Sequence, residues 1–391
     1  MENTQHYLKY NDARNLATLE KESIDLVVTS PPYPMIEMWD ETFNSLSSEI
    51  GDALQREDYY RSFSLMHEEL DKVWDELYRV LRPGGFACIN IGDAARTIGD
   101  KFQLFSNHSR IINSFWEKGF DTLPVILWRK QTNAPNKFMG SGMLPAGAYV
   151  TLEHEYVLIF RKGNKREFKT ENEKKNRRES AIFWEERNTW FSDLWDFKGI
   201  RQNISLNNTK QKEVDGKNNL RERSGAYPLL LPYRLISMFS VYGDTVLDPF
   251  LGTGTTSLAA MVCGRNSVGY EIDKNFASYL DKKIEDPGLV SELNSYHYER
   301  ILNHQEFVEE YTSRKGHPPK YSNEFFNFPV VTRQEINLKL VPIKKVIKEG
   351  EGKYKVDYDT FEKFFDKIVT PSNNENYASG QNLYQGQLFN Y

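Results

Sequence analysis

Residues 246–256, VLDPFLGTGTT, place a carboxylate, two closely spaced glycines and several hydroxyl groups between an apolar run and a helix-forming segment. Gly252 and Gly254 allow the backbone to turn tightly and to approach a ligand closely. About twenty residues further on, the next apolar run is followed by Glu271, and a carboxylate at that distance can accept hydrogen bonds from both ribose hydroxyls of a nucleotide-like cofactor. The order of strand, glycine turn, helix, strand and acid predicts a cofactor that contains a nucleoside.

The residues around the glycine turn favour S-adenosylmethionine over a dinucleotide. A dinucleotide fingerprint needs a third glycine, but this turn has Ser257 at that position. Asp248, at the end of the strand, suits a ligand with a cationic group better than it suits a pyrophosphate. S-adenosylmethionine carries an ammonium and a sulfonium and has no phosphate. A dinucleotide site and a purely structural turn are the alternatives.

A second stretch, TSPPY at residues 29–33, places a hydroxyl, two prolines and an aromatic ring directly after the apolar run IDLVV. A continuous apolar run of this length is expected in a strand that is covered on both faces. Prolines fix φ and have no N–H, so Pro31 and Pro32 hold the carbonyl between them without offering a competing donor. Considered alone, the turn could also be a structural strand terminator.

These two motifs need a scaffold in which strands and helices alternate. The first part of the chain has strand-like apolar runs and helical periodicity at 24–29, 67–82, 86–91, 111–118, 122–128 and 155–160. We expect the helix over 67–82 to end at the Pro83-Gly84-Gly85 stretch. The later part repeats the alternation, with a helix from near Pro232, a strand at 244–250, a helix after the glycine turn and a strand at 267–273. The pattern predicts an α/β fold with a mainly parallel sheet.

The composition changes along the chain and suggests four regions: 1–162, 163–224, 225–286 and 287–391. The second region is polar and rich in Lys, Arg and Asn, apart from the aromatic stretch WEERNTWFSDLWDF. For the two charged runs on either side of this stretch, GNKREFKTENEKKNRRES and NNTKQKEVDGKNNLRERSG, a solvated, mobile loop is an alternative to a folded segment. The fourth region contains a helical segment at 291–314 and a polar tail from about residue 370.

Composition and charge exclude several classes of protein. The chain is 39% hydrophobic and 27% charged, and its net charge of −5 does not fit a histone-like electrostatic binder, although a local basic patch can still bind DNA. Cys88 and Cys263 show neither a disulfide framework nor zinc-ligand spacing, and no acid–histidine cluster calls for a metal. The sequence shows no signal peptide and no apolar run of about 18 residues, so we expect a cytoplasmic protein with no membrane partner.

Together, the TSPPY, LDPFLGTGTT and GYEID motifs resemble those of the amino-group DNA methyltransferases. The order resembles their beta class, in which the catalytic half precedes the cofactor half. Looser matches are YNDARN, ELYRVLRPGGFACINIGD, HEYVLIFRKG and PLLLPYRLI, and the resemblance covers about residues 7–162 and 225–285. It implies a doubly wound, circularly permuted sheet of the S-adenosylmethionine-dependent methyltransferase type, with an inserted or C-terminal DNA-recognition region.

The resemblance implies a role for each motif. In the catalytic motif, Ser30, Pro31, Pro32 and Tyr33, the serine hydroxyl and the Pro31 carbonyl would accept the two N–H bonds of an exocyclic amine. Tyr33 would stack on a base flipped out of the duplex, and the methyl group would pass to nitrogen in one in-line displacement. The implied cofactor-binding residues are Asp12, Asp248, Pro249, Phe250, Gly252, Thr253, Gly254, Thr255, Glu271 and Asp273.

The target base is predicted from the serine of the turn. In this family SPPY usually accompanies cytosine N4 and DPPY adenine N6, and a serine is a poor proton sink, so we expect cytosine N4 with adenine N6 as the alternative. Ring-carbon methylation of cytosine is rejected because neither Cys88 nor Cys263 lies in a Pro-Cys pair. A catalytically silent DNA-binding module is the second alternative.

The resemblance also implies partners. Double-stranded DNA would be the substrate, and a cognate restriction endonuclease would be a separate chain. A homodimer is expected from the resemblance alone. DNA recognition is expected in residues 163–224, with residues 287–391 as the rival or second segment. Trp39, just after the catalytic motif, either covers the flipped base or lies in the core.

Overall fold

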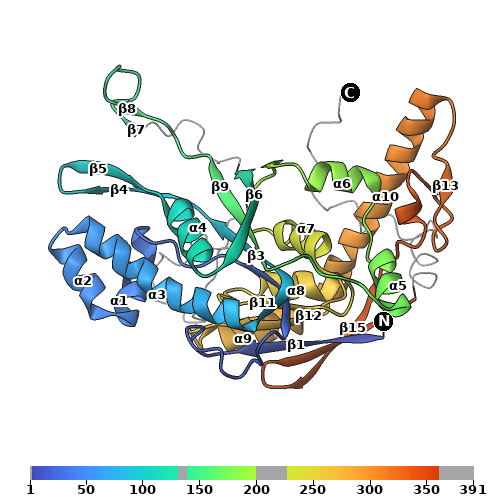
Figure 1. Ribbon diagram of the computed structural model, residues 1–391, viewed down its shortest axis with the longest axis horizontal. Helices are drawn as coiled ribbons and strands as arrows, with labels where there is room; N and C mark the ends of the chain where they lie inside the picture. The colour runs from blue at the N-terminus through green and yellow to red at the C-terminus, as the bar shows by residue number, and fades with distance from the viewer. Residues whose placement is uncertain (1, 131–138, 200–226, 361–391) are drawn as a thin grey trace.

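The computed structural model describes residues 2–130, 139–199 and 227–360, and its central feature is a ten-stranded sheet (Figure 1). The strand order is β10-β6-β9-β3-β2-β11-β12-β1-β16-β15. The strands are β1 (Asn3–Lys9), β2 (Ile24–Thr29), β3 (Leu81–Ile91), β6 (Phe120–Arg129), β9 (His154–Lys162), β10 (Leu194–Asp196), β11 (Thr245–Asp248), β12 (Asn266–Tyr270), β15 (Ile343–Gly350) and β16 (Lys353–Tyr358). Only β9 and β16 of these run against the other eight, which confirms the predicted α/β class with a mostly parallel sheet.

Helices cover both faces of the sheet. One face carries α1 (Asp40–Leu46), α2 (Ser48–Gln55), α3 (Tyr59–Val80) and α4 (Asn107–Glu117). The other carries α7 (Leu230–Phe239), α8 (Thr255–Val262), α9 (Phe276–Ile284) and α10 (Leu289–Lys315). Strand β2 contributes to both cores, because Leu26 and Val28 pack on one face and Val27 on the other. This two-sided burial explains the continuous apolar run that precedes the SPPY motif.

The Pro83-Gly84-Gly85 stretch has a different role from the one expected. Helix α3 already ends at Val80, and the three residues lie inside β3. Leu81 pairs with Ile24, whereas Phe86 pairs with Leu26, so the stretch forms an irregularity between two paired positions. The helix also begins earlier than predicted, because Asp58 caps it by accepting a hydrogen bond from the N–H of Arg61 (3.1 Å).

Two hairpins and several short elements lie outside the large sheet and the helices that cover it. The hairpins are β4 (Ala94–Ile98) with β5 (Lys101–Phe105) and β7 (Met139–Gly140) with β8 (Ala148–Tyr149). The short elements are η1 (Glu37–Trp39), β13 (Tyr321–Ser322), β14 (Pro329–Val330) and η3 (Arg333–Glu335). Across residues 2–130, 139–199 and 227–360, we find no helix with both the length and the apolarity to cross a membrane.

The polar region after residue 163 is folded as far as it is described. Helix α5 (Glu171–Glu179) begins with a capping box in which Thr170 and Glu173 each bond the other's backbone N–H. Helix α6 (Trp184–Trp190) follows, and β10 then pairs in parallel with β6. Residues 171–179 of the first charged run thus form a helix and not the alternative solvated loop, while residues 200–224 and the tail from 370 lie outside the described residues.

The polar region packs against the C-terminal region through a third, smaller core. Its buried members are Phe183, Ile301, Phe326, Val330, Leu338 and Leu340. Beside it, the Arg300 guanidinium donates to both carboxylate oxygens of Glu186, at 2.5 and 2.6 Å, and both side chains are buried. Through this core Phe183, just before α6, packs against α10 and the 321–340 segment, so the described parts of the two regions expected to recognise DNA pack together.

Candidate active site

A cavity of about 190 Å³ lies where the neighbouring parallel strands β2, β11, β12 and β1 end. Ser30 follows β2, Asp248 ends β11, Glu271 follows β12 and Asp12 comes shortly after β1, and all four line the cavity. Parallel strands present their carboxyl ends at the same edge, and ligands of open α/β sheets bind at this edge. The sheet thus brings together two motifs that are far apart in the sequence.

The glycine turn between β11 and α8 needs its glycines. Gly252 and Gly254 have φ of 49° and 74°, in the left-handed region that glycine adopts without strain. A Cβ at Gly254 would also lie 2.6 Å from Cδ2 of Leu280. Gly254 itself does not line the cavity, so its role in the turn is to shape the backbone.

Glu271 is held by the backbone on both of its oxygens. The N–H of Gly252 donates to Oε2 and the N–H of Asp273 donates to Oε1, each at 2.9 Å. Burial raises the pKa of the Glu271 carboxyl. Each carboxylate oxygen retains further acceptor capacity, so the group can bind a pair of hydroxyls such as a ribose diol.

Asp248 is buried at the end of β11, next to the catalytic motif. The hydroxyl of Thr29 donates to its Oδ1 at 2.5 Å, and the N–H of Phe250 donates to the same atom at 3.0 Å. Burial raises the pKa of this carboxyl. Tyr227 lines the cavity on the same side, and its hydroxyl contacts that of Thr256 at 2.5 Å. No motif in the sequence pointed to Tyr227.

Asp12 has a cationic partner, in contrast to the other two carboxylates. Nε and Nη2 of Arg14 donate to Oδ2 of Asp12 at 2.8 and 2.6 Å, and Nη1 of Arg14 donates to Oε2 of Glu69 at 2.5 Å. Burial alone would raise the pKa of Asp12, but the hydrogen bonds from Arg14 outweigh it and lower that pKa. Arg14 and Glu69 also line the cavity. Arg14 was visible in the YNDARN motif, whereas Glu69 comes from α3.

The hydroxyl of Ser30 belongs to a hydrogen-bonded chain. Ser30 Oγ donates to the hydroxyl of Tyr33 at 3.2 Å, and Tyr33 in turn donates to Oε2 of Glu155 at 3.0 Å. Nδ2 of Asn90 donates to both Tyr33 and Glu155, at 2.9 and 2.7 Å. Lys130 forms an ion pair with the other oxygen of Glu155. The Tyr33 hydroxyl is thus fully used, and burial raises its pKa well above the ordinary value.

The backbone after the catalytic motif is fixed by its surroundings. Nδ2 of Asn107 donates to the carbonyls of Pro34 and Gly92, at 3.1 and 3.0 Å. Met35 adopts a φ of 66°, a strained value for a residue with a side chain, and is 1% exposed. Tertiary packing holds this turn in place, so the SPPY segment is a rigid platform.

Most of the predicted site residues border the cavity. Those lining it are Asp12, Ser30, Pro32, Asp248, Pro249, Phe250, Gly252, Thr253, Thr255, Glu271 and Asp273. Three do not: Pro31, Tyr33 and Gly254. Trp39 lines the cavity, which favours a ligand contact over a purely structural place in the core. Lining residues that the sequence reasoning missed include Arg14, Met38, Glu69, Tyr227, Ile272 and Phe276.

The chain is similar to known DNA methylases over most of its length. Residues 24–282 match the DNA methylase family. The Type II methyltransferase M.MthZI of Methanothermobacter thermautotrophicus is 52% identical over 339 residues, which cover 86% of this chain and 90% of that protein. M.MjaI of Methanocaldococcus jannaschii, also a Type II methyltransferase, is 50% identical over 292 residues, covering 72% and 91% of the two chains.

A solved structure agrees with these matches. A putative DNA modification methylase from Thermus thermophilus, complexed with S-adenosyl-L-methionine, is 31% identical, with a TM-score of 0.52 over 71% of this chain and 93% of that one. The cavity described above fits this cofactor, because Glu271 can bind a diol and Asp248 can face a cationic group. The chain therefore belongs to the DNA methylase family and is an S-adenosylmethionine-dependent Type II DNA amino-methyltransferase.

Proposed function

We propose that this protein methylates the exocyclic N4 of cytosine at a specific site in double-stranded DNA, and thereby protects that site from a cognate restriction endonuclease on a separate chain. The observation that carries the proposal is that the Ser30 hydroxyl shares one cavity with the carboxylates of Asp12, Asp248 and Glu271. The serine supplies the acceptor for an amine, and the carboxylates supply the site for a cationic nucleoside cofactor. Adenine N6 is the alternative target.

The cofactor-binding residues have separable tasks in this proposal. Glu271, held by two backbone N–H groups, would accept hydrogen bonds from the ribose hydroxyls. Asp248 would offset the positive charge of the ligand. Asp12 would offset it as well, although its carboxylate already accepts hydrogen bonds from Arg14. Phe250 and Phe276 supply apolar walls. When bound, S-adenosylmethionine supplies an electrophilic methyl group on a sulfonium.

Ser30 is oriented as an acceptor. Its proton is donated to Tyr33, whose own proton is donated to Glu155, so the lone pairs of Ser30 Oγ remain available for an N–H of the target amine. An amine nitrogen whose N–H bonds are held by acceptors keeps a more localised lone pair and is a better nucleophile. The carbonyl of Pro31 is the proposed second acceptor. Most of the rate would come from this positioning, with no covalent intermediate.

The network gives Tyr33 a positioning role in addition to the predicted stacking role. Its hydroxyl binds Ser30, Glu155 and Asn90, and the residue does not line the cavity. Trp39 does line it, and its indole offers a second surface on which a flipped base could stack. The proposal therefore keeps Tyr33 in the catalytic set and adds Trp39 as a base contact.

We place sequence recognition in the packed unit formed by the polar insertion and the C-terminal region. The buried Glu186–Arg300 pair and the third core tie these segments together, so they would move against DNA as one body. A homodimer remains an expectation. The proposal predicts steep salt dependence of DNA binding, because lysines and arginines of the insertion would contact phosphates.

The direct test is to identify the methylated nucleoside. The protein is incubated with unmethylated plasmid DNA and S-adenosylmethionine, the DNA is digested to nucleosides, and the products are identified by mass spectrometry, with a reaction lacking the cofactor as control. N4-methylcytosine supports the proposal. N6-methyladenine would overturn the assignment of the base. Cofactor binding without any methylated nucleoside would favour the silent DNA-binding module.

A further inference from the structure

The β7–β8 hairpin exposes apolar side chains that nothing in the catalytic proposal uses. Residues 139–152 contain no charged side chain, although 27% of the chain is charged. Val150, Met143 and Leu144 are 86%, 80% and 70% exposed. In Figure 1 the tip of the hairpin projects away from the sheet, beyond the start of β9. A group of apolar side chains displayed in this way marks an interaction surface.

The tip of the hairpin is an ordered structure. The N–H of Ser141 donates to the carbonyl of Gly147 at 2.8 Å, and Ser141 Oγ donates to the carbonyl of Leu144 at 2.7 Å. Gly140 has a φ of 69°, and a Cβ there would lie 2.1 Å from the Gly147 oxygen. The backbone thus holds Met143 and Leu144 at the end of a narrow projection.

The base of the hairpin is connected to the catalytic turn. Beyond the carboxyl end of β6, the N–H of Lys130 donates to the carbonyl of Glu153 at 2.9 Å. The Lys130 side chain forms an ion pair with Glu155, which also accepts the hydrogen bond from Tyr33. The hairpin therefore projects from the same edge of the sheet that carries Ser30.

A second set of contacts leads from the hairpin to the cavity. The Tyr149 ring stacks on Phe102 of β5, with ring centroids 4.4 Å apart and an interplanar angle of 10°. In the paired strand β4, Arg96 donates to both oxygens of Asp40, at 2.9 and 2.7 Å. Asp40 directly follows Trp39, which lines the cavity. The two hairpins are thus braced against the segment beside the proposed base pocket.

We propose that Met143 and Leu144 insert between base pairs next to the target and fill the space that the flipped base leaves. The inference rests on the proposed function, in which a base of duplex DNA enters the cavity. Flipping leaves an unstacked gap, and proteins that distort DNA insert apolar wedges, Met and Leu among them, between base steps. The absence of carboxylates in residues 139–152 suits an approach to phosphates.

A second protein copy fits this surface less well than DNA does. A stable dimer buries on the order of 800 Å² per partner. Strands β7 and β8 have two residues each, and the exposed apolar side chains sit at and beside a narrow turn. A narrow projection enters a groove or a base step more readily than it forms a broad flat interface.

The test measures DNA unwinding, which needs neither the recognition sequence nor methyl transfer. A nicking–closing topoisomerase relaxes plasmid DNA in the presence of the protein, and the linking number is read by gel electrophoresis. The wild type should shift the linking number, and the double variant Met143→Ser, Leu144→Ser should lose most of that shift while its thermal midpoint stays unchanged. The matched control is Trp116→Ser, which removes a 68% exposed side chain near the end of α4 and should behave as wild type.

Single-turnover methylation of the same plasmid separates this inference from the proposed function. The double variant should methylate about ten-fold more slowly than wild type, because the unstacked base step would lose the apolar contacts that partly offset its cost. Equal linking-number shifts for the wild type and the double variant would show that Met143 and Leu144 do not insert into DNA, even if both proteins methylate it. A wild type that unwinds but transfers no methyl group, with the shift lost in the variant, would keep the wedge and overturn the proposed function. A changed sedimentation coefficient with unchanged unwinding would make the tip a dimer contact instead.

Discussion

We call the side of the sheet where β2, β11 and β12 end the carboxyl edge, and the side where they begin the amino edge. At the carboxyl edge, Asp248 and Glu271 are held by backbone N–H groups and a hydroxyl, and within the described ranges neither forms an ion pair. At the amino edge, Asp25 and Asp244 are 5% and 6% exposed, but arginines reach both of them. The two edges therefore contain fully or partly buried acids in opposite electrostatic settings.

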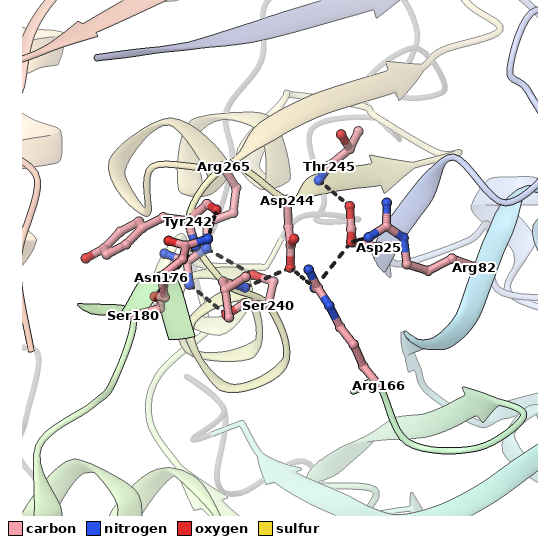
Figure 2. A network of polar contacts seen from close by, with 12 residues as sticks. Asp25, Arg82, Arg166, Asn176, Ser180, Ser240, Tyr242, Asp244, Thr245 and Arg265 are labelled. Atoms are coloured by element: carbon pink, nitrogen blue, oxygen red, sulfur yellow. Dashed lines mark hydrogen bonds and ion pairs between the residues drawn. The ribbon is translucent and has the colours of Figure 1, made fainter. Parts of the chain in front are cut away.

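Figure 2 shows how the amino edge is neutralised. Nη1 of Arg166 lies 3.3 Å from Oδ1 of Asp25 and 2.7 Å from Oδ2 of Asp244. Arg82 lies 2.6 Å from the same oxygen of Asp25, and the N–H of Thr245 donates to the other at 2.9 Å. Arg166 precedes α5, so this network also fastens the polar insertion to the starts of β2 and β11.

The comparison separates structural from functional carboxylates. A buried charge is expensive unless it is paired, so an edge that serves only the fold pairs its acids within the chain. The carboxyl edge instead holds two acids that line a cavity and that have no ion-pair partner among the described residues, as expected of a site that binds a ligand. Four substitutions test the contrast, in order of decreasing expected effect.

Ser30→Ala should produce the largest loss, and only in catalysis. Removing one well-placed polar group from a reacting centre typically lowers turnover by about 10²–10³-fold. Affinity for S-adenosylmethionine should stay nearly unchanged, because the acids of the carboxyl edge remain. Single-turnover rates and calorimetric titration measure the two quantities, with Ser109→Ala on α4 as control. An equal loss of rate and affinity would show that Ser30 is structural.

Arg166→Ala should produce the largest loss of stability. Among the described residues, Asp25 would keep only its ion pair with Arg82, and Asp244 would lose its ion pair with Arg166. Breaking a buried ion pair costs about 3 kcal/mol. Denaturant unfolding measures this change. Affinity for the cofactor should not change, because Arg166 lies at the opposite edge. Lys169→Ala, at an 80% exposed position, is the control. If Arg166→Ala lowered the cofactor affinity as much as a carboxyl-edge variant such as Glu271→Gln does, the two edges would not have separate roles.

The sequence predicted the carboxyl edge better than the amino edge, for a physical reason. Strand β2 occupies the expected residues 24–29 because a strand buried on both faces is a continuous apolar run. Motifs at the ends of parallel strands meet at one edge whatever the details of packing, so Ser30, Asp248 and Glu271 were predicted to lie together. Asp25 and Arg166 are 141 residues apart, and charges leave no periodic signal that reveals their pairing.

Elements and contacts fixed by tertiary pairing were missed in the same way. The β15–β16 hairpin forms the sheet edge beside β1. Strand β15 is mostly exposed and lysine-rich, and β16 buries only the alternate residues Tyr354 and Val356, so neither strand is a continuous apolar run. The hydrogen bonds of the Tyr33 hydroxyl were not predicted, because its partners Asn90 and Glu155 come from two other strands. Sequence reasoning named the groups that can do chemistry, and tertiary contacts decide how each one is oriented.

Glu271→Gln should weaken cofactor binding by about ten-fold, because hydrogen bonds to a charged group contribute about 1.5–3 kcal/mol. Burial raises the pKa of Glu271 above 4.5, so in the wild type the ionised acceptor is lost as the pH falls through that raised value. Affinity for S-adenosylmethionine should therefore decrease on acidification at pH values above 4.5, and the variant should show a flatter profile. Calorimetric titration across this range measures both effects. Parallel profiles would assign the pH dependence to another group.

The last effect, and the smallest when taken per pH unit, concerns the pH dependence of stability at the amino edge. Burial and the neighbouring Asp244 raise the pKa of Asp25 to about 7 from its ordinary value of 3.8. Between these two values the folded chain holds a proton that the unfolded chain has lost. The free energy of unfolding should therefore fall as the pH rises, by at most about 1.4 kcal/mol per pH unit.

Asp25→Asn removes this titration and should flatten the profile by that amount, as measured by denaturant unfolding at a series of pH values from about 4 to about 8. The slope is the informative quantity, since the variant also changes the contacts of Arg82 and Arg166 at every pH. Parallel slopes in wild type and variant would mean that the two arginines keep Asp25 ionised throughout. The amino edge would then be fully neutralised, and of these two edges only the one proposed to bind the cofactor would carry acids with raised pKa values.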